Sequence, residues 1–242
     1  LTIRAAVAAG FTEIKLTGEL SKTGIGGNWG TFINNKKITK CDLTGVTDWG
    51  RTPTLPDVAF ANCTALQEVT LPGDMKVIGG SAFSGCAALT TVNLSQVIWI
   101  NLNAFWGCTS LETLALDNVT AIGQEAFYGC TGLETLKIPK CTQFGNYIIS
   151  GCKALTRIEA TAAGDFVDIS DGRSSIERTA VFHNRDSHYG DSAFNPAKCD
   201  LVLNADKKQG GNATPKVFSD NEWLMMPNGQ LMRWNSITFA QQ

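Results

Sequence analysis

The stretches AFSGCAALTTVNL at residues 82–94, AFWGCTSLETLAL at 104–116 and AFYGCTGLETLKI at 126–138 are three copies of one phrase. Two more divergent copies flank them, AFANCTALQEVTL at 59–71 and IISGCKALTRIEA at 148–160. Each copy carries one cysteine, with gaps of 23, 22, 22 and 22 residues between successive cysteines, at Cys63, Cys86, Cys108, Cys130 and Cys152. A fixed period of roughly 20–50 residues is typical of a solenoid, in which each repeat stacks on its neighbours.

Each repeat is predicted to contain one short strand and a return segment. In residues 111–116 the side chains of Leu114 and Leu116 fall on one face after Leu111, as in a strand of period two. Strands one period apart then lie parallel, about 4.8 Å from each other. The Ala-Phe and Gly-Cys pairs before the strand predict a helical or irregular turn, because the short period leaves no room for a long helix. The strand pattern recurs at residues 11–16, 38–43 and 199–203.

We expect one domain with capped ends. Residues 1–203 form the solenoid and its N-terminal cap, with helical spacing at 1–10 and an insertion at about 161–192. Residues 204–242 form a C-terminal cap within the same domain. Two apolar arms flank Pro-Asn-Gly at residues 227–229, and this pattern predicts a β-hairpin.

The phrase AFxGCxxLxxLxL, with an Ile-Gly element upstream, resembles the BspA-type (Treponema-like) leucine-rich repeat of bacterial surface proteins. The resemblance is close over residues 55–160 and loose over 11–203. It implies an α/β repeat solenoid, a leucine-rich-repeat horseshoe with one curved parallel β-sheet and short helical or irregular return segments. It also implies a non-enzymatic secreted or cell-surface protein that adheres to a host extracellular-matrix protein or glycan. The alternative is a structural stalk or spacer in the cell envelope with no ligand of its own.

Composition excludes several classes of protein. The 242 residues include 43% hydrophobic side chains, which excludes wholesale disorder. The 20 Lys and Arg balance 22 Asp and Glu, so no basic surface for nucleic acid is expected. No stretch approaches the roughly 18 apolar residues of a transmembrane span. The chain begins at Leu1 without a basic segment or initiator Met, and we expect that a targeting segment has been removed.

The eight cysteines are predicted to be buried free thiols. Five share one column of the repeat, Cys141 aligns with Val97 and Val119, and Cys41 aligns with strand positions that face the core. Cysteines in stacked repeats have parallel Cβ vectors, which disfavours disulfides between them. The sequence contains no CxxC pair, so a cysteine metal site is not indicated either.

Catalytic and metal sites find little support. His183, Asp186, His188 and Asp191 could together hold a divalent ion, but their spacing fits no standard motif and a solvated loop is the favoured interpretation. No nucleophile elbow, HExxH or phosphate loop is present. We therefore expect neither an enzyme nor a cofactor.

Aromatic residues gather at variable positions of the return side, whereas the outward strand positions are rich in threonine and lack aromatics. The four are Trp99, Trp106, Tyr128 and Tyr147. Equivalent positions in other repeats hold Ala, Ser or Glu, so these rings are expected to be at least partly exposed and to form one binding patch, suited to a protein or a sugar. The competing interpretation packs them over the convex surface or against the 161–192 insertion.

Overall fold

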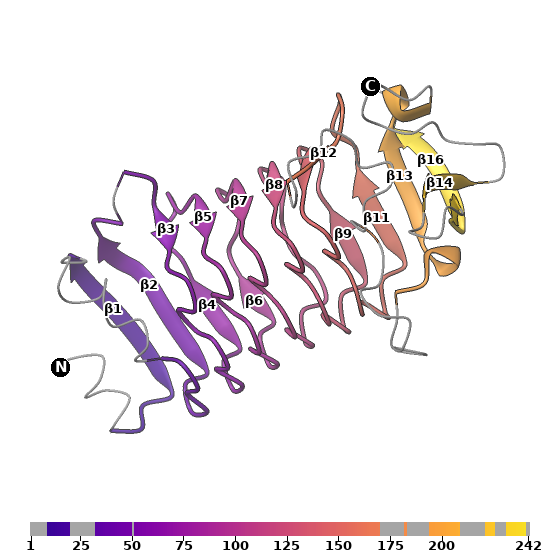
Figure 1. Ribbon diagram of the computed structural model, residues 1–242. Coiled ribbons are helices and arrows are strands. Elements are labelled where there is room, and N and C mark those ends of the chain that lie inside the picture. The colour runs from indigo at the N-terminus through magenta and orange to yellow at the C-terminus, as the bar shows by residue number, and fades with distance from the viewer. Residues whose placement is uncertain are drawn as a thin grey trace.

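In the computed structural model the repeats form coils that stack side by side in one elongated row (Figure 1). The structure describes residues 9–19, 32–49, 51–169, 182, 194–208, 221–225 and 231–240. Each coil crosses two faces of the stack, which we name the strand face and the return sheet. The helix expected at residues 1–10 and the four metal candidates from His183 to Asp191 lie outside the described residues.

The strand face consists of two parallel four-stranded sheets. Their strands are β1 (Glu13–Glu19), β2 (Lys40–Thr47), β4 (Glu68–Thr70) and β6 (Thr91–Val92), followed by β9 (Thr135–Lys137), β11 (Arg157–Ala160), β13 (Asp200–Asn204) and β16 (Ser236–Ala240). The register aligns Cys41 with Val69 and Val69 with Val92 on the buried side. The prediction of one parallel strand per repeat is therefore confirmed for most coils.

One coil departs from this prediction. Residues 111–116 bury Leu111 and Leu116, but they join no strand ladder and leave Leu114 only half-buried. Directly after β6, a side chain takes over the bonding between coils: the Asn93 side-chain amide accepts a hydrogen bond from Leu71 N at 2.6 Å and donates one to Leu71 O at 2.9 Å. The sheet is therefore divided in two where a single continuous sheet was expected.

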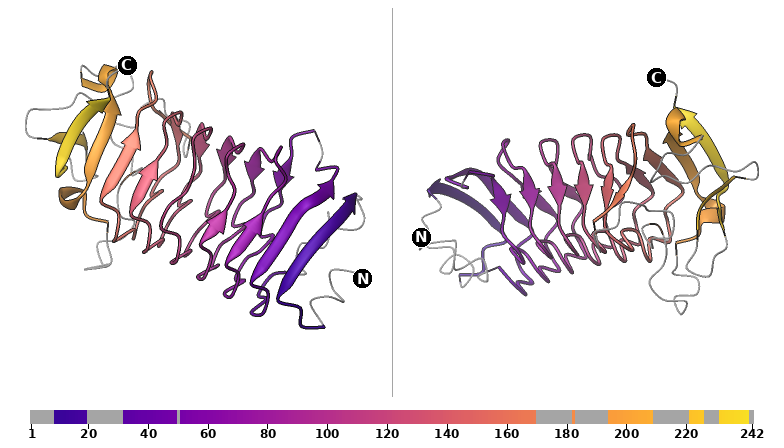
Figure 2. Two further views of the ribbon diagram at one scale, coloured as in Figure 1. Left: turned by 180° about the vertical axis from the view of Figure 1, so that it is seen from behind. Right: turned by 45° about the horizontal axis from the view of Figure 1, so that its top comes forward.

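The return sheet was not predicted. It is a third parallel sheet of six two-residue strands, ordered along the stack (Figure 2). They are β3 (Thr54–Leu55), β5 (Val77–Ile78), β7 (Trp99–Ile100), β8 (Ala121–Ile122), β10 (Gln143–Phe144) and β12 (Val167–Asp168). Because β12 pairs with β10, the segment interpreted as an insertion begins with one more coil of the solenoid.

A column of phenylalanine rings runs through the interior. Each ring stacks on its neighbour with centroids 5.1–5.7 Å apart, the members being Phe32, Phe60, Phe83, Phe105 and Phe127. All are fully buried. Burial of one such side chain contributes about 1.5–3 kcal/mol, so this column is a large part of the core.

The cysteine column lies beside the phenylalanine column. Each thiol donates to the carbonyl oxygen of the phenylalanine in the preceding coil, at 2.8–3.1 Å. All eight cysteines are free and buried, which confirms the prediction. Burial raises the pKa of Cys63 to about 12 and that of Cys108 well above its ordinary value, because the thiolate is poorly solvated there.

These thiols should be inert in the folded protein. At pH 8 we expect no reaction with a thiol reagent such as Ellman's reagent over minutes, since the reactive thiolate is suppressed. In denaturant without reductant, eight thiols should titrate per chain. Fewer than eight would indicate disulfides, and rapid reaction of the native protein would contradict the burial of this column.

Aromatic residues also close the C-terminal end of the stack. Phe166 and Phe182 both contact the ring of Trp223, which is fully buried on β14 (Glu222–Met225). Strand β14 pairs antiparallel with β15 (Leu231–Arg233), in the hairpin arrangement that the flanking apolar arms predict. Two short 3₁₀ helices flank β13, η3 (Pro196–Lys198) and η4 (Ala205–Lys208).

A buried lysine fastens the last coil to this end. Lys207 Nζ donates to the carbonyl oxygens of Ala162 and Gly164, at 3.1 and 2.6 Å, and pairs with Asp206 at 2.8 Å. It also lies 4.5 Å from the centre of the Phe166 ring. Its polar partners offset the cost of burying the ammonium group.

One position of every central coil adopts a left-handed backbone. The φ angle is 54–59° at the residue before each Ala-Phe or Ile-Ile pair, namely Val58, Ser81, Asn103, Glu125 and Tyr147. This conformation is costly for a β-branched side chain such as that of Val58, which gains little from burial because it is exposed.

Replacement of Val58 by Asn should therefore stabilise the protein. Val58→Asn relieves the backbone strain, and we expect the free energy of unfolding to rise by about 1 kcal/mol. The reciprocal change Ser81→Val at the equivalent position should lower it by a similar amount. Urea unfolding monitored by circular dichroism measures both; equal stability of the two variants and the parent would refute this origin of strain.

Candidate functional site

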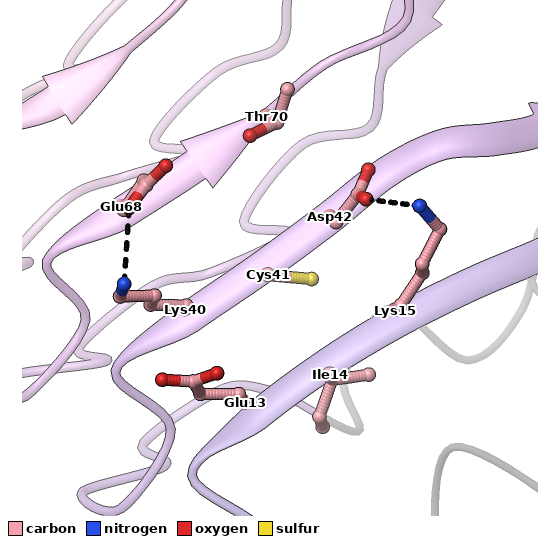
Figure 3. A pocket seen from close by; sticks show the side chains of 8 residues that line it. All are labelled: Glu13, Ile14, Lys15, Lys40, Cys41, Asp42, Glu68 and Thr70. Atoms are coloured by element: carbon pink, nitrogen blue, oxygen red, sulfur yellow. Dashed lines mark ion pairs between the residues drawn. The ribbon is translucent and has the colours of Figure 1, made fainter.

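The strand face carries a shallow hollow near the N-terminal end. It has a volume of about 360 Å³ and lies over β1, β2 and β4 (Figure 3). Its charged side chains pair across the strands: Lys15 lies 2.8 Å from Asp42, and Lys40 lies 3.6 Å from Glu68. Hydrogen bonds from Lys15 and Thr44 lower the pKa of Asp42 to about 2. The charges of this hollow therefore largely satisfy one another.

The middle of the strand face exposes small and polar side chains. Thr91, Thr113 and Ala115 are exposed there, and no large apolar side chain stands out. Binding hot spots favour Trp, Tyr and Arg, so this surface offers little to anchor a partner.

The return side is different, because one coil exposes a run of large apolar side chains. Among the described residues seven large hydrophobic side chains are exposed, and four of them fall between residues 98 and 106. These are Ile98 (41% exposed), Trp99 (45%), Leu102 (54%) and Trp106 (41%). We call these four residues the apolar coil.

Neighbouring coils do not share this feature. The register places Trp99 between Val77 and Ala121 on the return sheet. The sequence period places Ile98 between Lys76 and Thr120, and Leu102 between Gly80 and Gln124. The repeat architecture is therefore built equally well with small or polar residues, and the apolar coil is not required by folding.

Two of the four aromatic residues predicted as a patch are in contact. The indole of Trp106 stacks on the ring of Tyr128 with centroids 5.7 Å apart and planes 4° from parallel. Tyr128 is only 7% exposed, so its expected exposure is wrong: the indole covers one face of it. Tyr147 is half-buried in the left-handed backbone position described above. Trp99 and Trp106 are exposed as expected.

Other kinds of site receive no support from the described residues. Within the ranges given above, no cluster of three or more His, Cys, Asp or Glu side chains could hold a metal ion. In the same ranges, no helix has the length and apolar character needed to span a membrane.

The repeat sequence matches the model of a known protein family. The model for the BspA type leucine rich repeat region matches six copies over residues 31–156, slightly more than half of the chain. This chain belongs to that family. The resemblance inferred from the AFxGC phrase is thereby confirmed, and membership places the chain among leucine-rich-repeat binding and scaffold proteins.

Solved structures of similar proteins are also bacterial repeat proteins. The T. pallidum leucine rich repeat protein is 25% identical, with a TM-score of 0.46 over 50% of this chain and 58% of that one. A leucine rich cell surface protein from Faecalibacterium prausnitzii is 21% identical, with a TM-score of 0.38 over 79% of this chain and 58% of that one. A leucine-rich repeat protein from Bacteroides ovatus is 17% identical, with a TM-score of 0.38 over 86% and 65% of the two chains.

This BspA-type repeat protein thus spans less than two thirds of the length of each of these three chains. A search of the curated proteins finds no match.

Tryptophan fluorescence checks the exposure of the apolar coil. Trp223 and Trp234 are buried and Trp49 is half-buried, whereas Trp99 and Trp106 are open to solvent. The sixth tryptophan, Trp29, lies outside the described residues, so parent and variants all carry Trp29→Phe. In this background the double change Trp99→Phe/Trp106→Phe should remove most of the signal that iodide quenches. Trp49→Phe serves as the control and should leave iodide quenching nearly unchanged. Equal quenching of the double variant and the parent would mean that these indoles are covered in solution.

Proposed function

We propose that this chain is a non-enzymatic binding module, secreted or displayed on the cell surface, that adheres to a host protein or glycan through its return side. The observation that carries the proposal is the apolar coil: four large apolar side chains exposed within nine residues. Soluble proteins keep contiguous exposed apolar patches small, and larger ones mark interaction sites.

Energetic reasoning supports a binding role for these residues. Replacing exposed apolar side chains by Ser or Thr, as other coils do, would remove an aggregation hazard at little cost in stability. Trp is also among the residues most often found at binding hot spots. Retention of two exposed indoles in one coil is therefore better explained by a ligand than by the fold.

The alternative is a structural stalk or spacer without a ligand. The strand face favours it, since its charges pair internally and its centre carries threonines. A stalk, however, needs only coils that stack on one another, and all coils would then be expected to have equally polar outer surfaces. The apolar coil therefore supports a binding module over a stalk.

A binding screen tests the proposal. Purified protein is tested against immobilised matrix proteins and against arrays of host and microbial glycans, beside the variant Trp99→Ser/Trp106→Ser. This variant removes the ring that stacks on Tyr128, so thermal unfolding first confirms that the variant is folded. We expect a ligand whose binding falls at least tenfold in the variant.

A matched control is Thr91→Ala/Thr113→Ala on the strand face, which should bind as the parent does. Binding that survives in the return-side variant but disappears in the strand-face control would overturn the proposed site. The absence of any ligand across the screen would favour the stalk.

A further inference from the structure

The side chain after each core phenylalanine belongs to a column that stacks along the solenoid. The column is Ala61, Ser84, Trp106, Tyr128 and Ser150. Backbone bonds align its members: Gly85 N donates to Trp106 O and Gly107 N donates to Tyr128 O, both at 2.7 Å. The parallel contact between Trp106 and Tyr128 repeats the spacing of the buried phenylalanines. Side chains at this position therefore meet face to face, one coil apart.

One face of the Trp106 indole lacks a ring partner within this column. Tyr128 covers the face toward the next coil, while the equivalent position in the preceding coil is Ser84, whose side chain ends at a hydroxyl group. The exposed fractions agree with this, at 41% for Trp106 and 7% for Tyr128. The open indole face, together with Ser84 beside it, is named the Trp106 platform.

Neutral hydrogen-bonding groups lie in the two coils that precede Trp106. Ser84 supplies a hydroxyl group, and the Asn62 carboxamide lies so close to Gly85 that a Cβ on that glycine would collide with Asn62 Oδ1. Within the described part of the chain, neither the Ser84 hydroxyl nor the Asn62 side-chain amide has a hydrogen-bond partner. No member of the column is charged. The platform thus combines a flat apolar surface with unpaired, uncharged donors and acceptors.

We infer that the Trp106 platform binds one pyranose ring of a neutral glycan. The C–H face of the sugar stacks on the open indole face, and its hydroxyl groups bond to Ser84 and Asn62. This inference rests on the proposed function and names the ligand class for one part of the same surface. Because Ser84 carries no ring where Trp106 and Tyr128 carry one each in the following coils, a single sugar ring would extend this stack by one coil.

An aromatic side chain from a partner protein fits these observations less well. It would fill the space over the indole, but it would bury the Ser84 hydroxyl and the Asn62 amide without offering them partners, at a cost for each group. Protein hot spots also lie in well-packed pockets, whereas this platform is open on its outer side. A sugar supplies both an apolar face and hydroxyl groups.

The decisive variant fills the gap from within. Ser84→Tyr extends the Trp106–Tyr128 stack by one ring, in a column that already accepts Trp and Tyr, so the fold should be kept or slightly stabilised. Ser84→Ala keeps the indole face open and removes only one hydroxyl group. Thr113→Tyr on the strand face controls for an added exposed tyrosine.

The probe is a printed array of neutral, sialylated and sulfated oligosaccharides, followed by calorimetric titration of the strongest neutral glycan. We expect the parent to bind neutral glycans, Ser84→Tyr to bind at least tenfold more weakly, and Ser84→Ala and Thr113→Tyr to stay within a fewfold of the parent. Thermal unfolding of each variant confirms that it is folded.

Three results would overturn the inference: no neutral glycan binds the parent, Ser84→Tyr binds as tightly as the parent, or only charged glycans or proteins bind. Comparison with Trp99→Ser/Trp106→Ser separates the two proposals. If that variant loses a ligand that Ser84→Tyr retains, the binding function stands and the platform fails. If neither variant loses the ligand, both fail.

Discussion

Backbone hydrogen bonds between successive return segments hold the whole stack in register. In each central coil the amide of the core phenylalanine and the amide two residues later donate to carbonyl oxygens of the next coil, at 2.6–2.9 Å. Because the ladder runs without a shift through the repeats, residues one period apart lie directly above one another. The stacked phenylalanines, the thiols that donate to the preceding coil, and the contact between Trp106 and Tyr128 are all consequences of this alignment. The one extra residue between Cys63 and Cys86 leaves these columns aligned, since Phe60 and Phe83 still stack with centroids 5.5 Å apart and Phe60 N still donates to Ala82 O.

This dependence explains which features could be predicted from the sequence. The period, the parallel strands and the buried cysteines follow from residues that recur at fixed spacing, and spacing is visible in the sequence. The return sheet could not be predicted, because its strands are two residues long and show no alternation over that length. Strand β12 was missed because residues 161–169 lack the AFxGC phrase. Tyr128 was expected to be exposed from its variable position, but the Trp106 ring at the same position in the adjacent coil covers one of its faces, and variability at a single position does not reveal such a contact.

Under the proposed function, the strand face and the return side have different roles. On the strand face, Lys15 and Asp42 neutralise each other and threonines suit the extended backbone, so that surface is explained by folding and solubility alone. The C-terminal end is likewise explained by folding, since Trp223 and the buried Lys207 seal the last coil. A solenoid needs such closed ends, because an open terminal repeat would expose its apolar interior.

The apolar coil remains as the feature that the fold does not require. The stacking of the coils does not require its side chains, since adjacent coils carry Lys76, Thr120 or Ser84 at equivalent positions. Trp106 packs on Tyr128, yet all four side chains are exposed to water. The register between coils determines which surfaces of Trp106 are open. A ring in the column of Ser84, Trp106 and Tyr128 turns one face to each adjacent coil, and the residues at the equivalent positions there decide which face stays open. With Tyr128 on one side and a serine on the other, Trp106 has a ring partner on one face only within this column. Specificity in such a protein can therefore change by exchanging single residues within a column, while the ladder that supports the column stays intact.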